Sequence, residues 1–162
     1  MRCLRPIARR YRRLMWQRAN EGRLAPSAIV HGIERLDVGP RTAIGDHVVI
    51  WAAGGVSIGA DSLVAAGTVI TSQGHAVDAL RLGHMYRDTA VTEPIRIGAN
   101  VWVGANATVL PGARIGDNSI IAAGSVVKGE IPPATLVAGV PARVVRSLAF
   151  LEQASPVVEE TE

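Results

Sequence analysis

Aliphatic residues recur at every sixth position along the second half of this chain. A period of six matches neither the 3.6-residue repeat of a helix nor the simple alternation of a strand. It is typical of a solenoid, in which each repeat buries one aliphatic residue against the repeat stacked on it. The pattern therefore predicts an all-β solenoid built of six-residue repeats. The series is Ile97, Val103, Val109, Ile115, Ile121 and Val127.

Residues that favour turns occupy the fourth position of each six-residue repeat. Asn and Gly best tolerate left-handed backbone angles, so each short strand should end at a corner. Three repeats then form one coil of a triangular prism, and successive coils stack about 4.8 Å apart. An aromatic content of 4% agrees with a narrow interior that has no room for large rings. The corner residues are Asn100, Asn106, Gly112, Asn118 and Gly124.

An earlier series of repeats begins at Ile44 and slips by two residues at Val56-Ser57, where a local bulge at one corner could absorb the change. The rhythm stops at Ala76 and resumes after Pro94. We expect an excursion loop over 76–94, and loops of this length are usually functional or disordered. The predicted organisation is a basic N-terminal helix over 1–23, the β-helix over 24–142, and a C-terminal helix and tail over 143–162.

Positive charge is concentrated at the N-terminus. Residues 1–23 hold eight arginines and one acidic residue, although the net charge of the whole chain is only +3. Apolar side chains over 4–19 share one helical face, which predicts an amphipathic helix. This helix could cover the open first coil, or it could make weak contact with an anionic membrane surface. No aromatic or glycine-rich motif accompanies the arginines, so nucleic acid is not an expected partner.

Bulk properties place few further limits on the chain. Its 162 residues suggest one domain, and no apolar run of eighteen residues predicts a membrane span. The sequence shows no secretory signal, and a single cysteine, Cys3, excludes an internal disulfide. We expect a cytoplasmic protein. Residues 143–153 suggest a short closing helix.

Three motifs resemble those of the hexapeptide-repeat acyltransferases, and in particular the maltose and galactoside O-acetyltransferases and their relatives in polysaccharide synthesis. They are Gln73-Gly74-His75, Asn100-Val-Trp-Val-Gly104 and Gly139-Val-Pro-Ala-Arg143. The resemblance implies a left-handed parallel β-helix and a homotrimer with its sites in clefts between prisms. It also implies acetyl-CoA as co-substrate, a sugar acceptor and no metal.

His75 is the catalytic base that this resemblance implies. A sugar hydroxyl is a poor nucleophile until a base accepts its proton during attack on the thioester carbonyl. Imidazole suits this role because its pKa lies near neutrality. Asp78 is close in sequence but gives only a weak argument for what orients the ring. The remaining histidines are less informative: His47 occupies a corner as a tolerated turn residue, and His31 is expected to have no partner.

The resemblance also implies residues that bind the co-substrate and the acceptor. Small residues let the pantetheine arm of CoA lie close, arginines suit its phosphates, and a backbone N–H near Gly104 and Ala105 is expected to stabilise the oxyanion. The implied CoA-binding residues are Trp102, Ala105, Ala123, Lys128, Arg143 and Arg146. Met85 and His84 are the candidate acceptor contacts in the excursion loop.

The identity of the acceptor stays open. The stretch from Trp51 to Gly55 departs from the Asn and acidic residues that the galactoside and maltose enzymes carry in this region. A small or lipid-linked carbohydrate fits, and the sequence does not separate O- from N-acetylation. Two alternatives are a γ-type carbonic anhydrase and a non-catalytic assembly subunit. The first needs three histidines on zinc, but no third histidine follows His75 and His84.

Overall fold

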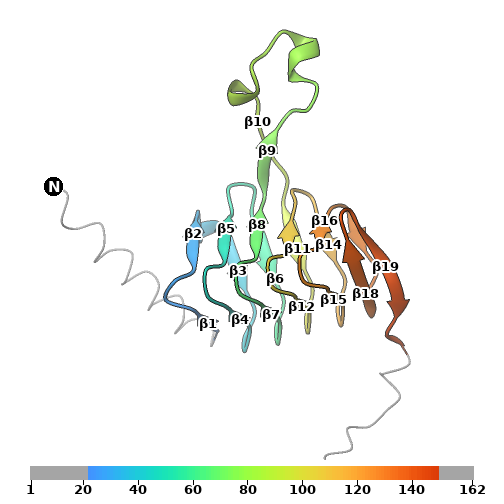
Figure 1. The fold of residues 1–162 in the computed structure, drawn as a ribbon. Helices are drawn as coiled ribbons and strands as arrows, with labels where there is room; N and C mark the ends of the chain where they lie inside the picture. Colours follow the sequence, from blue (N-terminus) through green and yellow to red (C-terminus); the bar gives the residue numbers. More distant parts are fainter. Residues whose placement is uncertain (1–21, 150–162) are drawn as a thin grey trace, which may run out of the picture.

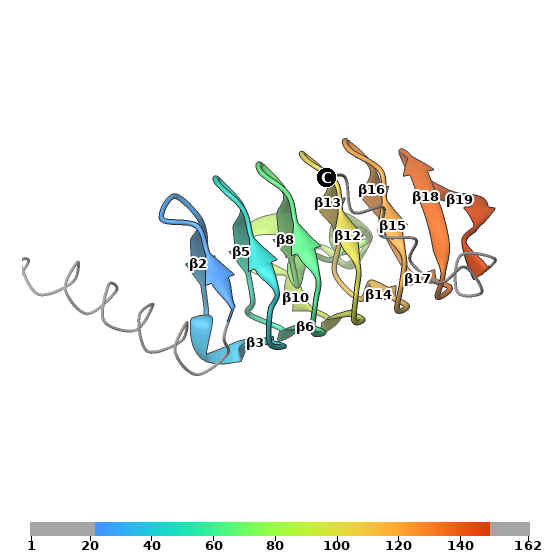
Figure 2. The same cartoon turned by 90° about the horizontal axis from the view of Figure 1, so that it is seen from below.

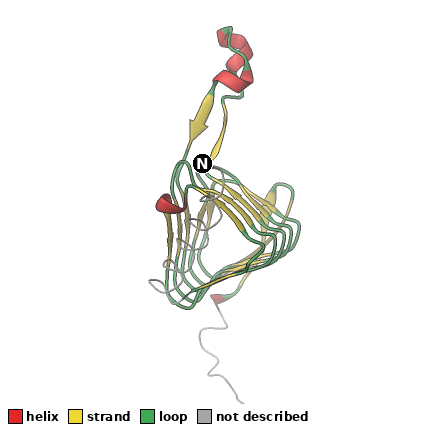
Figure 3. Cartoon of the chain, turned by 90° about the vertical axis from the view of Figure 1, so that its left-hand side faces the viewer, coloured by secondary structure: helices red, strands yellow, loops and turns green. Residues whose placement is uncertain are grey.

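The computed structural model describes residues 22–149, which form one β-solenoid with a triangular cross-section (Figures 1 and 3). Three sheets make the three faces of this prism. Sheet A contains seven strands, and sheets B and C contain five each. Neighbouring strands are parallel throughout, except in two hairpins formed by β9 with β10 and by β18 with β19. The left hand of the coil remains an expectation from the resemblance.

The strands are short because each spans a single face of the prism. Sheet A consists of β1 (Arg23–Leu24), β4 (Ala43–Ile44), β7 (Leu63–Val64), β12 (Trp102–Val103), β15 (Ile120–Ile121), β18 (Thr135–Gly139) and β19 (Ala142–Ser147). Sheet B consists of β2 (Ile29–His31), β5 (Val49–Trp51), β8 (Val69–Thr71), β13 (Thr108–Val109) and β16 (Val126–Val127), which lie side by side in Figure 2. Sheet C consists of β3 (Leu36–Val38), β6 (Val56–Ile58), β11 (Ile95–Ile97), β14 (Arg114–Ile115) and β17 (Glu130–Ile131).

Three short 3₁₀ helices complete the described elements. They are η1 (Ile33–Arg35), η2 (Ala79–Leu82) and η3 (Tyr86–Asp88). None of the helices in the described part of the chain is long and apolar enough to cross a bilayer.

The interior of the prism is made of aliphatic columns, as the six-residue period predicts. In sheet A, Val64 lies in register with Val103, and Val103 with Ile121. In sheet B, Ile70 lies in register with Val109, and Val109 with Val127. All six residues of the sequence series are buried. Burying one such side chain contributes about 1.5–3 kcal/mol, so the columns are the main source of stability.

The predicted corners are also confirmed. Asn100, Asn106 and Asn118 have φ angles of 51°, 56° and 59°. His47 has a φ of 56°, which agrees with its interpretation as a turn residue. The Asn100 amide donates a 2.8 Å hydrogen bond to the Asn118 side-chain oxygen in the next coil. Stacked corners therefore add polar contacts between coils to the apolar contacts inside.

The two-residue slip lies at the corner between sheets B and C. Strand β5 ends at Trp51 and β6 begins at Val56, and both Val56 and Ile58 are buried. The first coil has the same wide corner, because β2 ends at His31 and β3 begins at Leu36. β3 then pairs with β6 in register. Paired strands are accordingly twenty positions apart in the first coils and eighteen apart later. The irregularity that the sequence suggested at one corner is therefore shared by successive coils.

The closing helix predicted from residue 143 is wrong over 143–147. These residues belong to β19, which pairs antiparallel with β18 after a turn at Val140-Pro141. The β-branched Val144 and Val145 suit a strand, and β18 offers an unpaired edge that a helix would leave open. Residues 150–153 lie outside the described residues, as does the helix predicted over 4–19.

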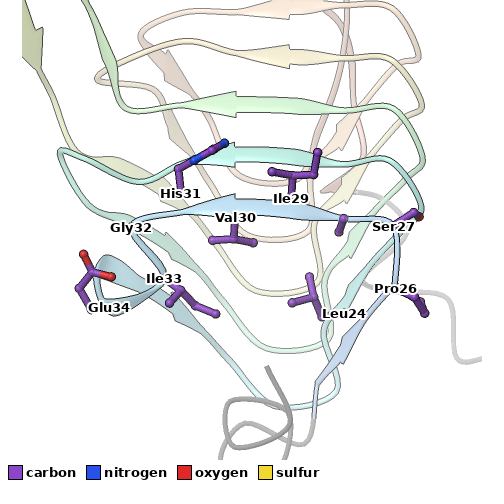
Figure 4. A pocket seen from close by; sticks show the side chains of 10 residues that line it. Leu24, Pro26, Ser27, Ile29, Val30, His31, Gly32, Ile33 and Glu34 are labelled. Carbon is purple, nitrogen blue, oxygen red and sulfur yellow. The ribbon is translucent and has the colours of Figure 1, made fainter. Parts of the chain in front are cut away.

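A hollow of about 530 Å³ lies at the first-coil end of the prism (Figure 4). Leu24, Val30 and Ile33 contribute apolar side chains to it, and Glu34 lies at its rim. Within the described residues no earlier coil stacks here. This open end, with its exposed apolar side chains, is the surface that the predicted N-terminal helix would cover.

Replacing an interior residue should destabilise the prism far more than replacing its outward-facing neighbour. Ile121→Ala should lower the free energy of unfolding by about 2–5 kcal/mol, because the fixed coils above and below cannot collapse into the cavity. Ile120→Ala is the matched control, since Ile120 is adjacent in the same strand and only partly buried. Denaturant titration measures both, and equal losses would contradict the assignment of Ile121 to the interior column.

Candidate functional site

The excursion from the prism carries His75. It leaves the corner between sheets B and C in the third coil as a two-stranded hairpin, formed by β9 (Gln73–His75) and β10 (Ala90–Thr92) (Figures 1 and 3). His75 lies opposite Ala90 in this hairpin. The excursion therefore includes two paired strands at its base, and it uses the same corner that is already wide in the first two coils.

The base of the hairpin is tied to the preceding coil by Ser72. The buried Ser72 hydroxyl donates a 2.8 Å hydrogen bond to the Trp51 carbonyl and accepts one of 2.9 Å from the Gly54 N–H. The Ser72 carbonyl accepts a 2.9 Å hydrogen bond from the N–H of Glu93, which directly follows β10 where the chain returns to the prism. One residue thus fixes both legs of the excursion relative to the corner of coil 2.

His75 lies beside a hollow of about 340 Å³. Its walls come from the end of β5, from β8 and from both strands of the hairpin, and they include Trp51, Thr71, Gln73 and Ala90. The His75 side chain is exposed, and within residues 22–149 its imidazole makes no hydrogen bond or ion pair. The ring is therefore available to accept a proton from a bound hydroxyl.

The two acceptor candidates in the loop lie away from this hollow. His84 and Met85 fall between η2 and η3, at the far end of the excursion from β9 and β10 (Figure 1). Both side chains are exposed, and the His84 N–H donates a 2.9 Å hydrogen bond to the Ala79 carbonyl. Within one chain the structure does not bring them together with His75.

Ala105 and Ala123 lie in successive coils at a different corner, between sheets A and B. The Ala105 carbonyl accepts a 2.9 Å hydrogen bond from the Gly124 N–H, which joins the two coils. A side chain on the neighbouring Gly104 would clash, because its Cβ would lie 2.6 Å from the Ala123 nitrogen. The column continues to the turn between β18 and β19, where Gly139 donates to the Ser125 hydroxyl at 3.2 Å. We call it the small-residue column.

Arg143 stands at the end of the small-residue column, opposite Ala138 in the last hairpin. Its side chain is exposed, and one guanidinium nitrogen donates a 2.9 Å hydrogen bond to the Ala142 carbonyl. Arg146 is further along β19, opposite Leu136. Of the two arginines, Arg143 is therefore the one placed beside the column.

Trp102 and Lys128 are not part of the small-residue column. Trp102 is exposed on the outer face of sheet A, in register with Leu63 and Ile120. Lys128 follows β16 at the corner between sheets B and C, which is the corner that carries the excursion. The residues that the resemblance implies for CoA thus lie at both edges of sheet B and on sheet A, and not at one corner.

His31 has a partner, contrary to the expectation from the sequence. Its imidazole stacks on the Trp51 indole with ring centroids 4.1 Å apart and an interplanar angle of 21°. The two residues lie in register on β2 and β5. Their spacing of twenty residues equals the length of the first coils. A search of the sequence for aromatic residues one coil length apart could therefore have predicted this pair.

The described part of the chain contains no group of three or more His, Cys, Asp or Glu residues that could hold a metal ion. His31 stacks on Trp51, whereas His47 lies at the corner between sheets A and B. His75 and His84 are separated along the excursion. A zinc site of three histidines therefore has no ligand set among residues 22–149.

Comparison with known proteins places the coiled prism among transferases with hexapeptide repeats. The family model for bacterial transferase hexapeptide (six repeats) matches residues 94–129, and that for the hexapeptide repeat of succinyl-transferase matches residues 36–72. A hexapeptide-repeat containing acetyltransferase from Vibrio cholerae O1 biovar eltor, complexed with acetyl coenzyme A, superposes with a TM-score of 0.74 and 32% identity, over 80% of this chain and 69% of that one.

Galactoside O-acetyltransferase of Escherichia coli (strain K12) is 43% identical over 95 residues, which are 57% of this chain and 44% of that protein. A putative lipopolysaccharide biosynthesis O-acetyl transferase of the same strain is 38% identical over 109 residues, which are 64% and 56% of the two chains. The protein belongs to the hexapeptide-repeat acetyltransferase family. It spans about half the length of the curated relatives it matches.

Loosening the base of the excursion should lower activity beyond its effect on stability. Ser72→Ala leaves the Trp51 carbonyl and the Gly54 N–H without this partner, at a cost of about 1–3 kcal/mol in unfolding free energy. Ser62→Ala is the matched control, because its buried hydroxyl also bridges two backbone groups, at another corner. Acetyl transfer measured well below both melting temperatures should fall only for Ser72→Ala. An equal fall in both variants would contradict a positioning role for Ser72.

Proposed function

We propose that this protein is an acetyl-CoA-dependent O-acetyltransferase that acts on a carbohydrate hydroxyl. The observation that carries the proposal is the exposed, unpartnered His75 beside a hollow at the root of an excursion anchored by Ser72. The small-residue column supports it, because an extended arm can lie close to backbone only where side chains are small. Relatives named for acetyl transfer to galactosides and in lipopolysaccharide synthesis support a sugar acceptor.

The reaction is a direct transfer within a ternary complex. The His75 imidazole accepts the proton of the acceptor hydroxyl as its oxygen attacks the thioester carbonyl. The tetrahedral intermediate collapses when the C–S bond breaks, and the CoA thiolate leaves and takes the proton from the imidazolium. Products are the acetyl ester and CoA, so no metal or covalent enzyme intermediate is needed to balance the step.

The Ala105 N–H is the proposed donor to the oxyanion. The neighbouring Gly104 N–H already donates a 2.8 Å hydrogen bond to the Ile121 carbonyl, which removes it from this role. Among the described residues the Ala105 N–H has no such acceptor. A backbone donor held by stacked coils is preorganised for the developing charge, which is the condition for effective oxyanion stabilisation.

The proposed assembly is a homotrimer with its sites between prisms. His75 and the small-residue column lie at opposite edges of sheet B, so one chain does not bring base and thioester together. A cyclic head-to-tail contact would place the His75 corner of one prism beside the small-residue column of the next, and three such contacts close a ring. Lys128 lies at the His75 corner, so it would approach CoA from the opposite side of the cleft to Arg143.

Removing the proposed base should lower turnover while leaving the fold intact. His75→Ala should reduce kcat by about 10²–10⁴-fold, which is the usual contribution of a positioned general base. His47→Asn is the matched control, because it replaces an exposed histidine at another corner with a residue that also tolerates a positive φ. The assay measures free thiol released from acetyl-CoA in the presence of acceptor. Unchanged turnover in His75→Ala would remove this residue from the mechanism.

Removing the arginine beside the small-residue column should weaken CoA binding. Arg143→Ala should cost about 1.5–3 kcal/mol of binding free energy if the guanidinium makes a charge-assisted bond to phosphate. The loss should be smaller for dephospho-CoA if the ribose phosphate is the partner. Arg114→Ala is the control, since Arg114 is exposed on sheet C and pairs with Glu130. Calorimetric titration with CoA and with dephospho-CoA measures the Kd of the wild type and of both variants. An unchanged Kd for CoA in Arg143→Ala would contradict the assignment.

A further inference from the structure

We infer that Trp51, backed by His31, is the platform on which the acceptor sugar stacks, and that the Gln73 side chain binds the hydroxyls of that sugar. The inference rests on the proposed function and names how the acceptor is recognised. Its structural basis is the stacked His31–Trp51 pair at the edge of the His75 hollow.

Trp51 borders the hollow that contains His75. It also borders a second hollow of about 270 Å³, which is lined by His31, Glu34 and Arg35 among others. Gln73 is the other residue that lines both hollows. Trp51 and Gln73 therefore both border the place where these two hollows meet, between the first coil and the base of the excursion.

The stack leaves one face of the indole for a ligand. Trp51 lies in register with His31 on one side and with Thr71 on the other. The imidazole occupies the face toward the first coil, so the opposite face turns toward Thr71 and the His75 hollow. Trp51 is 37% exposed, so a ligand can reach the ring. A stacked ring loses little freedom on binding, because its orientation is already fixed.

The chemistry of this surface fits a pyranose. A sugar ring has an apolar face of C–H groups, which an aromatic ring can cover, and a rim of hydroxyls that need hydrogen-bonding partners. The Gln73 amide offers two donors and one acceptor. Within residues 22–149 its side chain has no hydrogen-bond partner, whereas its backbone is fixed by two bonds with the Thr71 hydroxyl.

Geometry connects this platform to the reaction. Thr71 is one strand spacing, about 4.8 Å, from Trp51. β8 ends at Thr71, and His75 closes β9, which starts two positions later at Gln73. A ring lying on the free face of Trp51 would occupy the same hollow as the His75 imidazole. This arrangement would present a hydroxyl of the ring to the base.

The test separates acceptor binding from CoA binding. A panel of methyl glycosides is screened for thiol release from acetyl-CoA, and for direct binding by saturation-transfer NMR. Trp51→Ala should raise the KM of an active glycoside about tenfold or more, and Trp51→Phe should keep it within about threefold, because a ring is retained. The KM of acetyl-CoA should not change in either variant. Gln73→Leu should raise the acceptor KM in the same way.

His31 is a positioning residue in this proposal, so its variants should act through the stack. His31→Ala should raise the acceptor KM less than Trp51→Ala, and His31→Phe should restore it because the aromatic contact returns. Ile29→Ala is the matched control, since Ile29 is exposed on the same strand and is expected to leave both KM values unchanged. Light scattering checks that every variant keeps the oligomeric state of the wild type.

The outcomes distinguish the platform from the reaction. Thiol release by wild type with an unchanged acceptor KM in Trp51→Ala would overturn the platform alone. Glycoside binding that is lost in Trp51→Ala without any thiol release would support the platform and overturn the proposed reaction. Absence of both glycoside binding and thiol release in wild type would overturn both. Dissociation of the oligomer in Trp51→Ala would assign the residue to a subunit contact instead.

Discussion

In-register stacking of one coil on the next is the constraint on which this structure depends. Most strands contain only two or three residues, too few to be stable as isolated pairs. Their hydrogen bonds persist because each strand also aligns an aliphatic residue with the column inside the prism, as Val64, Val103 and Ile121 do. A shift of one residue would turn that side chain out to solvent and bring a neighbour of the wrong size inside, such as Trp102 or Gly104 in place of Val103.

This constraint decides where the chain can vary. Extra residues are tolerated only at corners, where they leave the register of the flanking strands unchanged. The corner between sheets B and C holds η1 in the first coil, the extra residues from Ala52 to Gly55 in the second, and the excursion with His75 in the third. The proposed base is thereby placed on the excursion, while the faces beside it hold Trp51 and Thr71 at a fixed spacing.

Local periodicity predicted the prism and its corners, because both features repeat every six residues, and it located the interruption because the repeat stops there. Contacts between coils were harder to read. The His31–Trp51 stack joins residues twenty positions apart, and that spacing has meaning only once the length of the first coils is known. The strand over Ala142–Ser147 was missed for a related reason: its partner is the edge of β18, and a short stretch with two valines does not reveal which edge is open.

The proposed functional groups are separated across sheet B, and this separation would make the reaction depend on subunit assembly. His75 stands at one edge of the sheet, whereas the Ala105 N–H and Arg143 stand at or near the other. In the proposed trimer these edges meet only between neighbouring prisms, so a single prism would bind CoA without a base near its thioester. Assembly would then be a condition for transfer, and the cleft would exclude water that could otherwise hydrolyse the thioester. A rigid solenoid suits this division, because its corners hold both halves of the site in place before the subunits meet.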